Sequence, residues 1–406
     1  MATGFFIAGC SASPIRAVVA PAAPASDSSV SRPSDGVCRF TGPLTLAAPA
    51  ADGSIEVPPT HPLVSYLGRV DCQAPGGPLL GFVGASVRVR FVGTGLELKL
   101  DDFGRGTAQS TNYYDVSVDG GRPALLEVSP QQKQYVLAAG LPEGEHLVEL
   151  FKRGESGPGG NVGAGLGKVL GFKLHGRQLL PVSLPSRRLE FVGDSITCGY
   201  GNEVSTNDPG SAPFTTRASN GHKAYGALTA ARLGASYVAV AYSGRGVSRN
   251  YAGSPGQVLP ELYLQSVPEA PSATRWDPAQ YTPDAVIINL GSNDFSTPGV
   301  DRRAFAESYA RFLTTLRGYY PQAALVVVIG PMLSDAYPPG ENALSSVTAE
   351  LNEVLAARAR AGDSRVHLVT LSTQSGPWGE DWHPSLATHE RMADELTPRL
   401  KTILGW

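Results

Sequence analysis

Two different hydrophobic patterns divide the chain near residue 185. Before that point, apolar and polar residues alternate strictly in "SVRVRFVG" at 86–93 and again in "LELKL" at 96–100. Such alternation is typical of strands with one buried and one solvent-facing side, and "DGG" at 119–121 is a hairpin-type turn. Because no helical pattern lies between these short strands, they predict an all-β domain over about 40–180, a β-sandwich of jelly-roll type.

Beyond residue 185 the apolar runs become continuous, and amphipathic helical patterns lie between them. The runs include "LEFVG", "AVIINLG" and "ALVVVIG". Continuous runs that alternate with helices predict a parallel sheet covered on both faces. The expected fold is a multidomain chain, an N-terminal β-sandwich (jelly roll) followed by a C-terminal α/β/α domain with a parallel sheet. The predicted boundaries are 1–37 for an export-signal or lipobox remnant with a flexible Ala/Pro/Ser-rich tether, 38–184 for the sandwich and 185–406 for the α/β domain.

Three long segments show neither pattern. Residues 202–223 and 251–284 are long for loops in a compact domain, and such loops usually build an active site. The third segment, "GESGPGGNVGAG" from Gly154, is rich in glycine and is expected to be a flexible loop inside the sandwich domain.

Four strand ends of the predicted parallel sheet carry polar residues. In an open parallel sheet, ligands bind beyond the carboxyl ends of the strands, so these four segments are expected to converge on one edge. The segments are Gly193-Asp194-Ser195, Ser243-Gly244-Arg245-Gly246, Gly291-Ser292-Asn293-Asp294 and Asp381-Trp382-His383.

These residues are of the types that a serine hydrolase uses in catalysis. Ser195 is a weak nucleophile until a base such as His383 takes its proton, and a carboxylate such as Asp381 would orient the imidazole. A backbone carbonyl, for instance that of Trp382, is the alternative to Asp381. The expected oxyanion donors are the backbone N–H groups of Ser195 and Gly244 and the side chain of Asn293. The competing interpretation of Ser195 is a helix N-cap, and Asp194 is assigned to capping or a structural hydrogen bond.

In this order and context, Ser195, Gly244, Asn293 and His383 resemble the four signature blocks of the SGNH (GDSL-like) hydrolases. The preceding jelly roll narrows the resemblance to carbohydrate esterase family 2, as do "EFVGDSITCGYGN", "YSGRGVSRNY", "PDAVIINLGSNDFS" and "DWHPSLATHERMA". The likeness extends from about Gly68 to Leu404. It implies an SGNH hydrolase domain at 185–406 and a carboxylic ester hydrolase of the acetylxylan esterase type, which needs no cofactor and removes acetyl groups from polysaccharides such as xylan and glucomannan. In this family the aspartate stands two residues before the histidine, as Asp381 does.

The two tryptophans beside the predicted base, Trp378 and Trp382, fit either core packing or a stacking face for a sugar ring. Two rival functions remain open at this point. One is an SGNH esterase for another acyl substrate, such as a lipid, a thioester or peptidoglycan O-acetyl groups. The other is a carbohydrate-binding surface protein.

Composition and charge exclude several partners. The formal net charge is −3 and no segment concentrates Lys and Arg, which argues against nucleic acid. No apolar run is long enough to span a bilayer, and no metal-binding motif appears. Near the N-terminus, Ile7-Ala8-Gly9 before Cys10 resembles a bacterial lipobox, so Cys10 is a candidate for a lipid anchor. We therefore expect a bacterial protein that is exported, in which Cys38 and Cys72 are able to pair, whereas Cys198 is a buried thiol.

Overall fold

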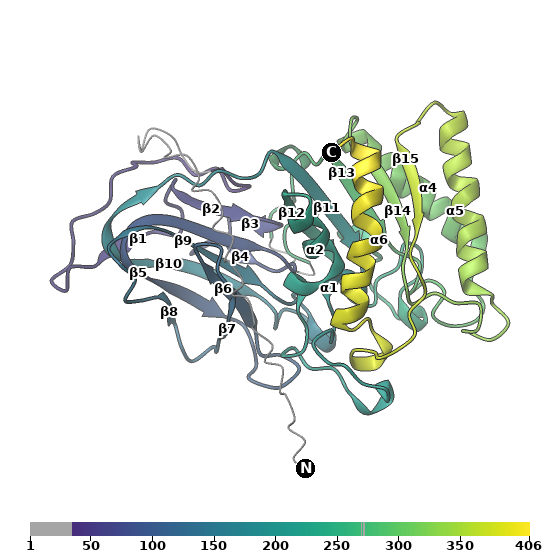
Figure 1. Cartoon of the computed structure of the whole chain (residues 1–406), viewed down its shortest axis with the longest axis horizontal. Coiled ribbons are helices and arrows are strands. Elements are labelled where there is room, and N and C mark those ends of the chain that lie inside the picture. Colours follow the sequence, from purple (N-terminus) through teal and green to yellow (C-terminus); the bar gives the residue numbers. More distant parts are fainter. Residues whose placement is uncertain (1–34, 269, 271–272) are drawn as a thin grey trace, which may run out of the picture. The chain divides into compact units, whose positions relative to one another are not determined.

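The computed structural model describes residues 35–268, 270 and 273–406, and these residues form two sheets (Figure 1). The strands of the first sheet are all antiparallel: β1 (Ile55–Val57), β2 (Val64–Leu67), β3 (Val70–Asp71), β4 (Leu79–Leu80), β5 (Ser86–Asp102), β6 (Tyr113–Val118), β7 (Ala124–Glu127), β8 (Gln134–Ala138), β9 (Gly144–Lys152) and β10 (Gly167–Leu180). The large antiparallel domain followed by an α/β domain confirms the predicted two-domain fold.

Strand β5 is a single strand where the sequence pattern suggests two. The glycines between the two alternating stretches allow close backbone approach instead of a turn. A Cβ at Gly93 would lie 2.4 Å from the carbonyl oxygen of His175 on the neighbouring β10. The pairing of β5 with β10 shifts register at this point and then continues, so β5 runs for 17 residues.

Residues 35–37, the described part of the predicted tether, are bound to the antiparallel domain. The N–H of Asp35 donates to the carbonyl of Val182, and the N–H of Val37 donates to that of Tyr66, each at 2.8 Å. Cys38 forms a disulfide with Cys72, as the sequence allowed. Cys10 lies outside the described residues.

The second sheet is parallel, with the strand order β12-β11-β13-β14-β15. Its strands are β11 (Arg187–Gly193), β12 (Ala235–Ala241), β13 (Ala285–Asn289), β14 (Ala324–Ile329) and β15 (Val366–Thr370). The helices of this domain are α1 (Ser195–Cys198), α2 (Tyr225–Arg232), α3 (Leu259–Leu262), α4 (Arg302–Tyr319), α5 (Ala343–Arg360) and α6 (Leu386–Leu404). Strand β12 lies on one side of β11, and β13, which follows in the chain, lies on the other. The strand order therefore reverses at β11.

Alternate residues of each parallel strand enter two separate cores. Phe191 and Ile287 pack with residues of α2 and α6, whereas Val192 and Ile288 pack with residues of α4 and α5. The helix pairs therefore cover opposite faces of the sheet (Figure 1). This burial on both faces explains the continuous apolar runs in the sequence. No helix in the described part of the chain is long and apolar enough to cross a membrane.

A buried ion pair joins the antiparallel domain to the strand that leads to Ser195. The guanidinium of Arg69, between β2 and β3, donates to the carboxylate of Glu190 on β11 at 3.0 Å, and both side chains are fully buried. The guanidinium also donates to the carbonyl of Tyr263 at 2.9 Å and lies 4.4 Å from the ring centre of Trp276. Removing one partner of such a pair leaves a charge buried without compensation.

Arg69→Ala is therefore expected to lower the free energy of unfolding by about 3–5 kcal/mol, measured by denaturant titration. The control is Arg177→Ala, which removes an exposed ion pair with Glu143 and should cost less than about 1 kcal/mol. Equal losses in the two variants would contradict the importance of the buried pair.

Candidate active site

Ser195 lies at the point where the strand order of the parallel sheet reverses. It is the first residue of α1, two residues after the end of β11, and it is 7% exposed. Gly193 makes this tight exit from the strand possible, because a Cβ there would lie 2.0 Å from the hydroxyl oxygen of Thr197. The N-cap of α1 is Asp194, whose carboxylate accepts the N–H of Ile196 at 3.0 Å. Ser195 is therefore not the cap, and its hydroxyl is free for another partner.

That partner is His383, in the loop before α6. The Oγ of Ser195 lies 2.8 Å from the Nε2 of His383. The other ring nitrogen, Nδ1, lies 3.0 Å from the carbonyl oxygen of Asp381 and 3.1 Å from that of Glu380. Carbonyl oxygens only accept, so Nδ1 carries the proton and Nε2 is left to accept the proton of Ser195. The predicted nucleophile and base are thus in contact.

The carboxylate of Asp381 makes no hydrogen bond to His383 in this structure, which differs from the predicted arrangement. Its carboxylate accepts a hydrogen bond from the hydroxyl of Tyr200 at 2.7 Å, and its backbone carbonyl faces the imidazole instead. The cause is a left-handed backbone at Asp381, with φ 47° and ψ 48°. The carbonyl of Trp382, the example named from the sequence, accepts instead from Gln374 at 2.7 Å. Backbone carbonyls do face the base, but they are those of Glu380 and Asp381 and not that of Trp382.

Tyr200 is a site residue that the sequence analysis missed. Its ring stacks on the imidazole of His383, with 4.1 Å between ring centres and 25° between planes, and Phe214 packs against Tyr200. The available signal was its place in the serine block, "GDSITCGYGN". This packing removes water from His383, and burial lowers the pKa of His383 to about 4. The base is therefore neutral, and able to accept a proton, throughout the neutral range.

Glu380 connects the long segment 202–223 to the loop before α6, which carries His383. Its carboxylate accepts the N–H and the hydroxyl of Thr215, each at 2.8 Å, and burial raises its pKa. The carbonyl of Glu380 at the same time faces His383. This segment thus lies at the site, as its length predicts.

The backbone N–H groups of Ser195 and Gly244, the residues predicted as backbone oxyanion donors, have no acceptor within the described residues. The neighbouring N–H groups of Ile196, Ser243 and Arg245 all have acceptors. Gly244 has φ 76°, which favours glycine, and follows β12 as Ser195 follows β11. An N–H group without an acceptor is available to an oxyanion.

Asn293, after β13, is already engaged. Its Nδ2 lies 3.0 Å from the carboxylate of Asp194 and 3.0 Å from the carbonyl of Arg245. Both amide hydrogens therefore face an acceptor inside the protein, and donation to an oxyanion requires sharing one of them. Asp194 also accepts the hydroxyl of Ser292, while burial raises the pKa of Asp194 to about 6. The predicted structural role of Asp194 agrees with these bonds, and the oxyanion role of Asn293 stays a prediction.

The two tryptophans differ in their surroundings. Trp378 is half-buried, and its backbone exchanges two hydrogen bonds of 2.8 Å with Thr206. Trp382 is 55% exposed and has φ 60°. Of the two tryptophans, Trp382 is therefore the more accessible to a ligand.

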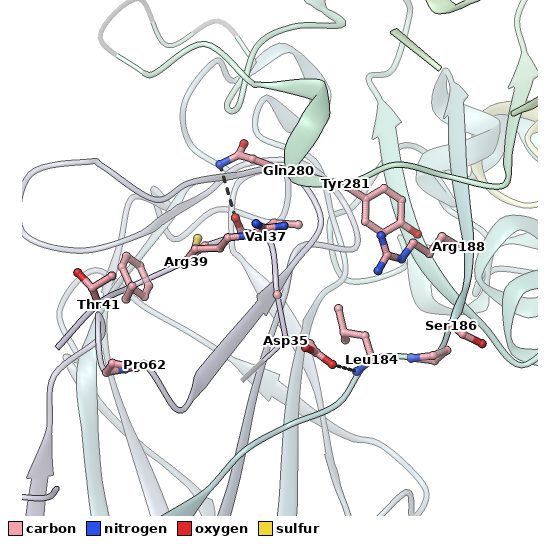
Figure 2. Close-up of a pocket in the computed structure, with 14 residues that line it drawn as sticks. Asp35, Val37, Arg39, Thr41, Pro62, Leu184, Ser186, Arg188, Gln280 and Tyr281 are labelled. Atoms are coloured by element: carbon pink, nitrogen blue, oxygen red, sulfur yellow. Dashed lines mark hydrogen bonds between the residues drawn. The ribbon is translucent and has the colours of Figure 1, made fainter. Parts of the chain in front are cut away.

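Within the described ranges, no three His, Cys, Asp or Glu side chains are grouped as a metal site. A cavity of about 380 Å³ is lined by residues that include Asp35, Val37, Arg188 and Tyr281 (Figure 2). Arg188 is at the start of β11, whereas Ser195 follows its end, about 20 Å away along a strand of this length. The cavity therefore belongs to the opposite edge of the sheet and not to the candidate site.

The pKa of His383 can be tested by NMR titration of the histidine ring signals. We expect a pKa of about 4 for His383, below the 6.5 of an exposed histidine, so the ring protonates only in acid. His146 is an internal control, because its bond to Asp119 raises its pKa. A His383 pKa of 6.5 or higher would contradict the burial that the structure shows.

Comparison with known proteins agrees with this arrangement. Residues 191–391 match the model of the GDSL-like Lipase/Acylhydrolase family, and residues 66–182 match the Carbohydrate esterase 2 N-terminal model. The chain is 36% identical over 351 residues to the cellulase/esterase CelE of Acetivibrio thermocellus, an alignment that covers 85% of this chain but only 40% of that protein. It is 30% identical over 351 residues to an acetylxylan esterase / glucomannan deacetylase of Cellvibrio japonicus, covering 86% of this chain and 90% of that protein.

Solved structures give the same result. A family two carbohydrate esterase from Clostridium thermocellum, in complex with cellohexaose, matches with a TM-score of 0.75 and 36% identity, over 84% of this chain and 99% of that chain. One from Cellvibrio japonicus matches with a TM-score of 0.75 and 28% identity, over 87% of this chain and 98% of that chain. With both domains and the serine and histidine blocks matched, the chain belongs to carbohydrate esterase family 2.

Proposed function

We propose that this chain is a serine esterase that removes O-acetyl groups from carbohydrate, such as acetylated xylan, glucomannan or their oligosaccharides. The observation that carries the proposal is the 2.8 Å contact of Ser195 Oγ with His383 Nε2, beside two backbone N–H groups without acceptors. Relatives named as acetylxylan esterases and glucomannan deacetylases support the substrate class.

The geometry supports a two-step acyl transfer. Ser195 Oγ attacks the acetyl carbonyl carbon while its proton passes to His383 Nε2. The oxyanion of the tetrahedral intermediate accepts from the N–H groups of Ser195 and Gly244, with Asn293 as a further donor. His383 then gives its proton to the departing sugar oxygen, which leaves an acetyl-enzyme. Water, activated by His383, attacks this ester, acetate leaves, and the proton returns to Ser195.

The exposed ring of Trp382 is the proposed stacking face for a pyranose ring. Trp378 was also a predicted substrate contact, and its half-buried side chain and its pairing with Thr206 favour a role in shaping the loop. The complex of a relative with cellohexaose is consistent with a carbohydrate partner.

We also propose that the chain is exported and that its domains divide as 1–37, 38–184 and 185–406. The disulfide of Cys38 with Cys72 supports an oxidising compartment, and the family matches at 66–182 and 191–391 support the division. A lipid anchor at Cys10 rests on the sequence pattern alone.

Ser195→Ala tests the nucleophile. We expect acetate release from acetylated xylan and glucomannan to fall by at least about 10³-fold, because no other group can form the acetyl-enzyme. Unchanged thermal unfolding would show that the variant is folded. Activity of the wild type on an aryl acetate but on neither polysaccharide would keep the mechanism and reject the substrate. Faster cleavage of long acyl esters than of acetyl esters would favour a lipid substrate instead.

Asp381→Asn tests the orientation of the base. Since the backbone carbonyls hold Nδ1, we expect kcat to fall less than about tenfold, compared with about 10⁴-fold for an aspartate that contacts the imidazole directly. The measurement is kcat on an aryl acetate, with His383→Ala as the reference for full loss. A loss as large as that of His383→Ala would mean that the carboxylate itself acts on the base.

A further inference from the structure

The loop between β9 and β10 reaches from the antiparallel domain into the catalytic domain. Its Glu155 is 5% exposed, and the Oε2 of this carboxylate accepts the N–H of Ser243 at 2.7 Å. The thiol of Cys198, at the end of α1, lies 3.7 Å from the same oxygen. One carboxylate thus lies between the helix that begins with Ser195 and the loop after β12.

Ser243 directly precedes Gly244, whose N–H has no acceptor and is one of the two predicted backbone donors. The backbone on both sides of this donor is fixed. Glu155 holds the N–H of Ser243 on one side, and on the other the carbonyl of Gly244 accepts the N–H of Tyr251 at 2.8 Å. Further along, Asp294 accepts the N–H groups of 247–249. The direction of the Gly244 N–H therefore depends on these anchors.

The loop that carries Glu155 is built to stay in place. The ammonium of Lys152 donates to the carbonyls of Gly154 at 2.5 Å and Glu155 at 3.2 Å. A Cβ at Gly157 would lie 2.0 Å from the hydroxyl oxygen of Tyr242, so only glycine lets the chain pass there. Part of this segment, which is predicted to be a flexible loop, is closely packed: a Cβ at Gly165 would lie 1.8 Å from the carbonyl oxygen of Glu155, whereas Gly154 and Gly160 have open space beside them.

Burial of an acidic side chain is costly, and here burial raises the pKa of Glu155. An apolar side chain would fill the same space without this cost, but it would leave the N–H of Ser243 without its acceptor. The free-energy cost of burying the Glu155 carboxylate is understandable if its hydrogen bond to Ser243 has a role beyond packing.

We propose that Glu155 is a positioning residue for the oxyanion site, which holds the Gly244 N–H through its bond to Ser243. The inference rests on the proposed esterase function. It makes the antiparallel domain part of the catalytic apparatus, because that domain supplies the acceptor.

The test compares Glu155→Ala and Glu155→Gln in the full chain with an aryl acetate as substrate. In Glu155→Ala we expect kcat to fall by about 10–100-fold, somewhat less than the loss of an oxyanion donor itself, with KM changed less than threefold. Glu155→Gln keeps an oxygen acceptor and should recover kcat to within about fivefold of the wild type. The acid limb of the pH profile should not move in either variant, because His383 is not touched.

Asp71→Ala is the matched control. Asp71 is also a buried carboxylate of the antiparallel domain, and it accepts the N–H of Thr274, in the catalytic domain, at 3.1 Å. Its loss should lower the unfolding temperature in a similar way but leave kcat within twofold. If Glu155→Ala fails to fold, Glu155→Met fills the space without an acceptor and replaces it.

Several outcomes would overturn the inference. The first is a kcat within twofold of wild type in folded Glu155→Ala or Glu155→Met. The second is an equal loss of kcat in the Glu155 and Asp71 variants. The third is failure of both Glu155→Ala and Glu155→Met to fold, which would mean that the role of Glu155 is purely structural. If the wild type itself does not cleave the aryl acetate, the proposed function fails, and this result is distinct from the others.

Discussion

The ion pair of Arg69 with Glu190 fixes the antiparallel domain on the strand that carries the nucleophile. Both groups are fully buried, so separating the domains would leave one or both charges without a partner in an apolar environment. The pair therefore favours a single arrangement of the two domains. Glu190 lies in the middle of β11, so the relation between the domains is set on the strand that leads to Ser195.

That fixed arrangement allows the antiparallel domain to contribute at short range. Arg153, just after β9, donates to the carboxylate of Glu203 at 2.6 Å, in the long segment that also reaches Glu380. Two residues further on, Glu155 holds Ser243. Hydrogen bonds of this length tolerate little displacement. A domain that merely carried a separate sugar-binding surface would not need such contacts at the edge of the sheet where Ser195 and Gly244 follow their strands.

The sequence predicts the site well where the sheet topology does the placing. Ser195, Gly244 and Asn293 each follow a parallel strand, and parallel strands end at one edge, so their approach follows from strand order. The sequence does not predict the site where a single backbone dihedral angle decides which group faces His383. The positive φ of Asp381 turns its carbonyl, not its carboxylate, to His383, and an aspartate in that turn looks the same in sequence either way. The close packing of Gly157 and Gly165 in the Glu155 loop cannot be predicted from sequence either, because glycine is frequent both in flexible segments and in tightly packed ones.

The use of carbonyls in place of a carboxylate has a consequence for the base. Carbonyl dipoles stabilise an imidazolium less than a full negative charge would, and with burial this keeps His383 neutral in the resting enzyme. A weaker base transfers a proton efficiently only if its cation is stabilised as the reaction proceeds. In the proposed mechanism the oxyanion that forms beside Ser195 supplies such a charge, and the Asp381 carboxylate, held by Tyr200, also favours the cation. If Gly244 is an oxyanion donor as proposed, the strength of the base is coupled to the oxyanion site, and the groups that hold Gly244 in position also support proton transfer to His383.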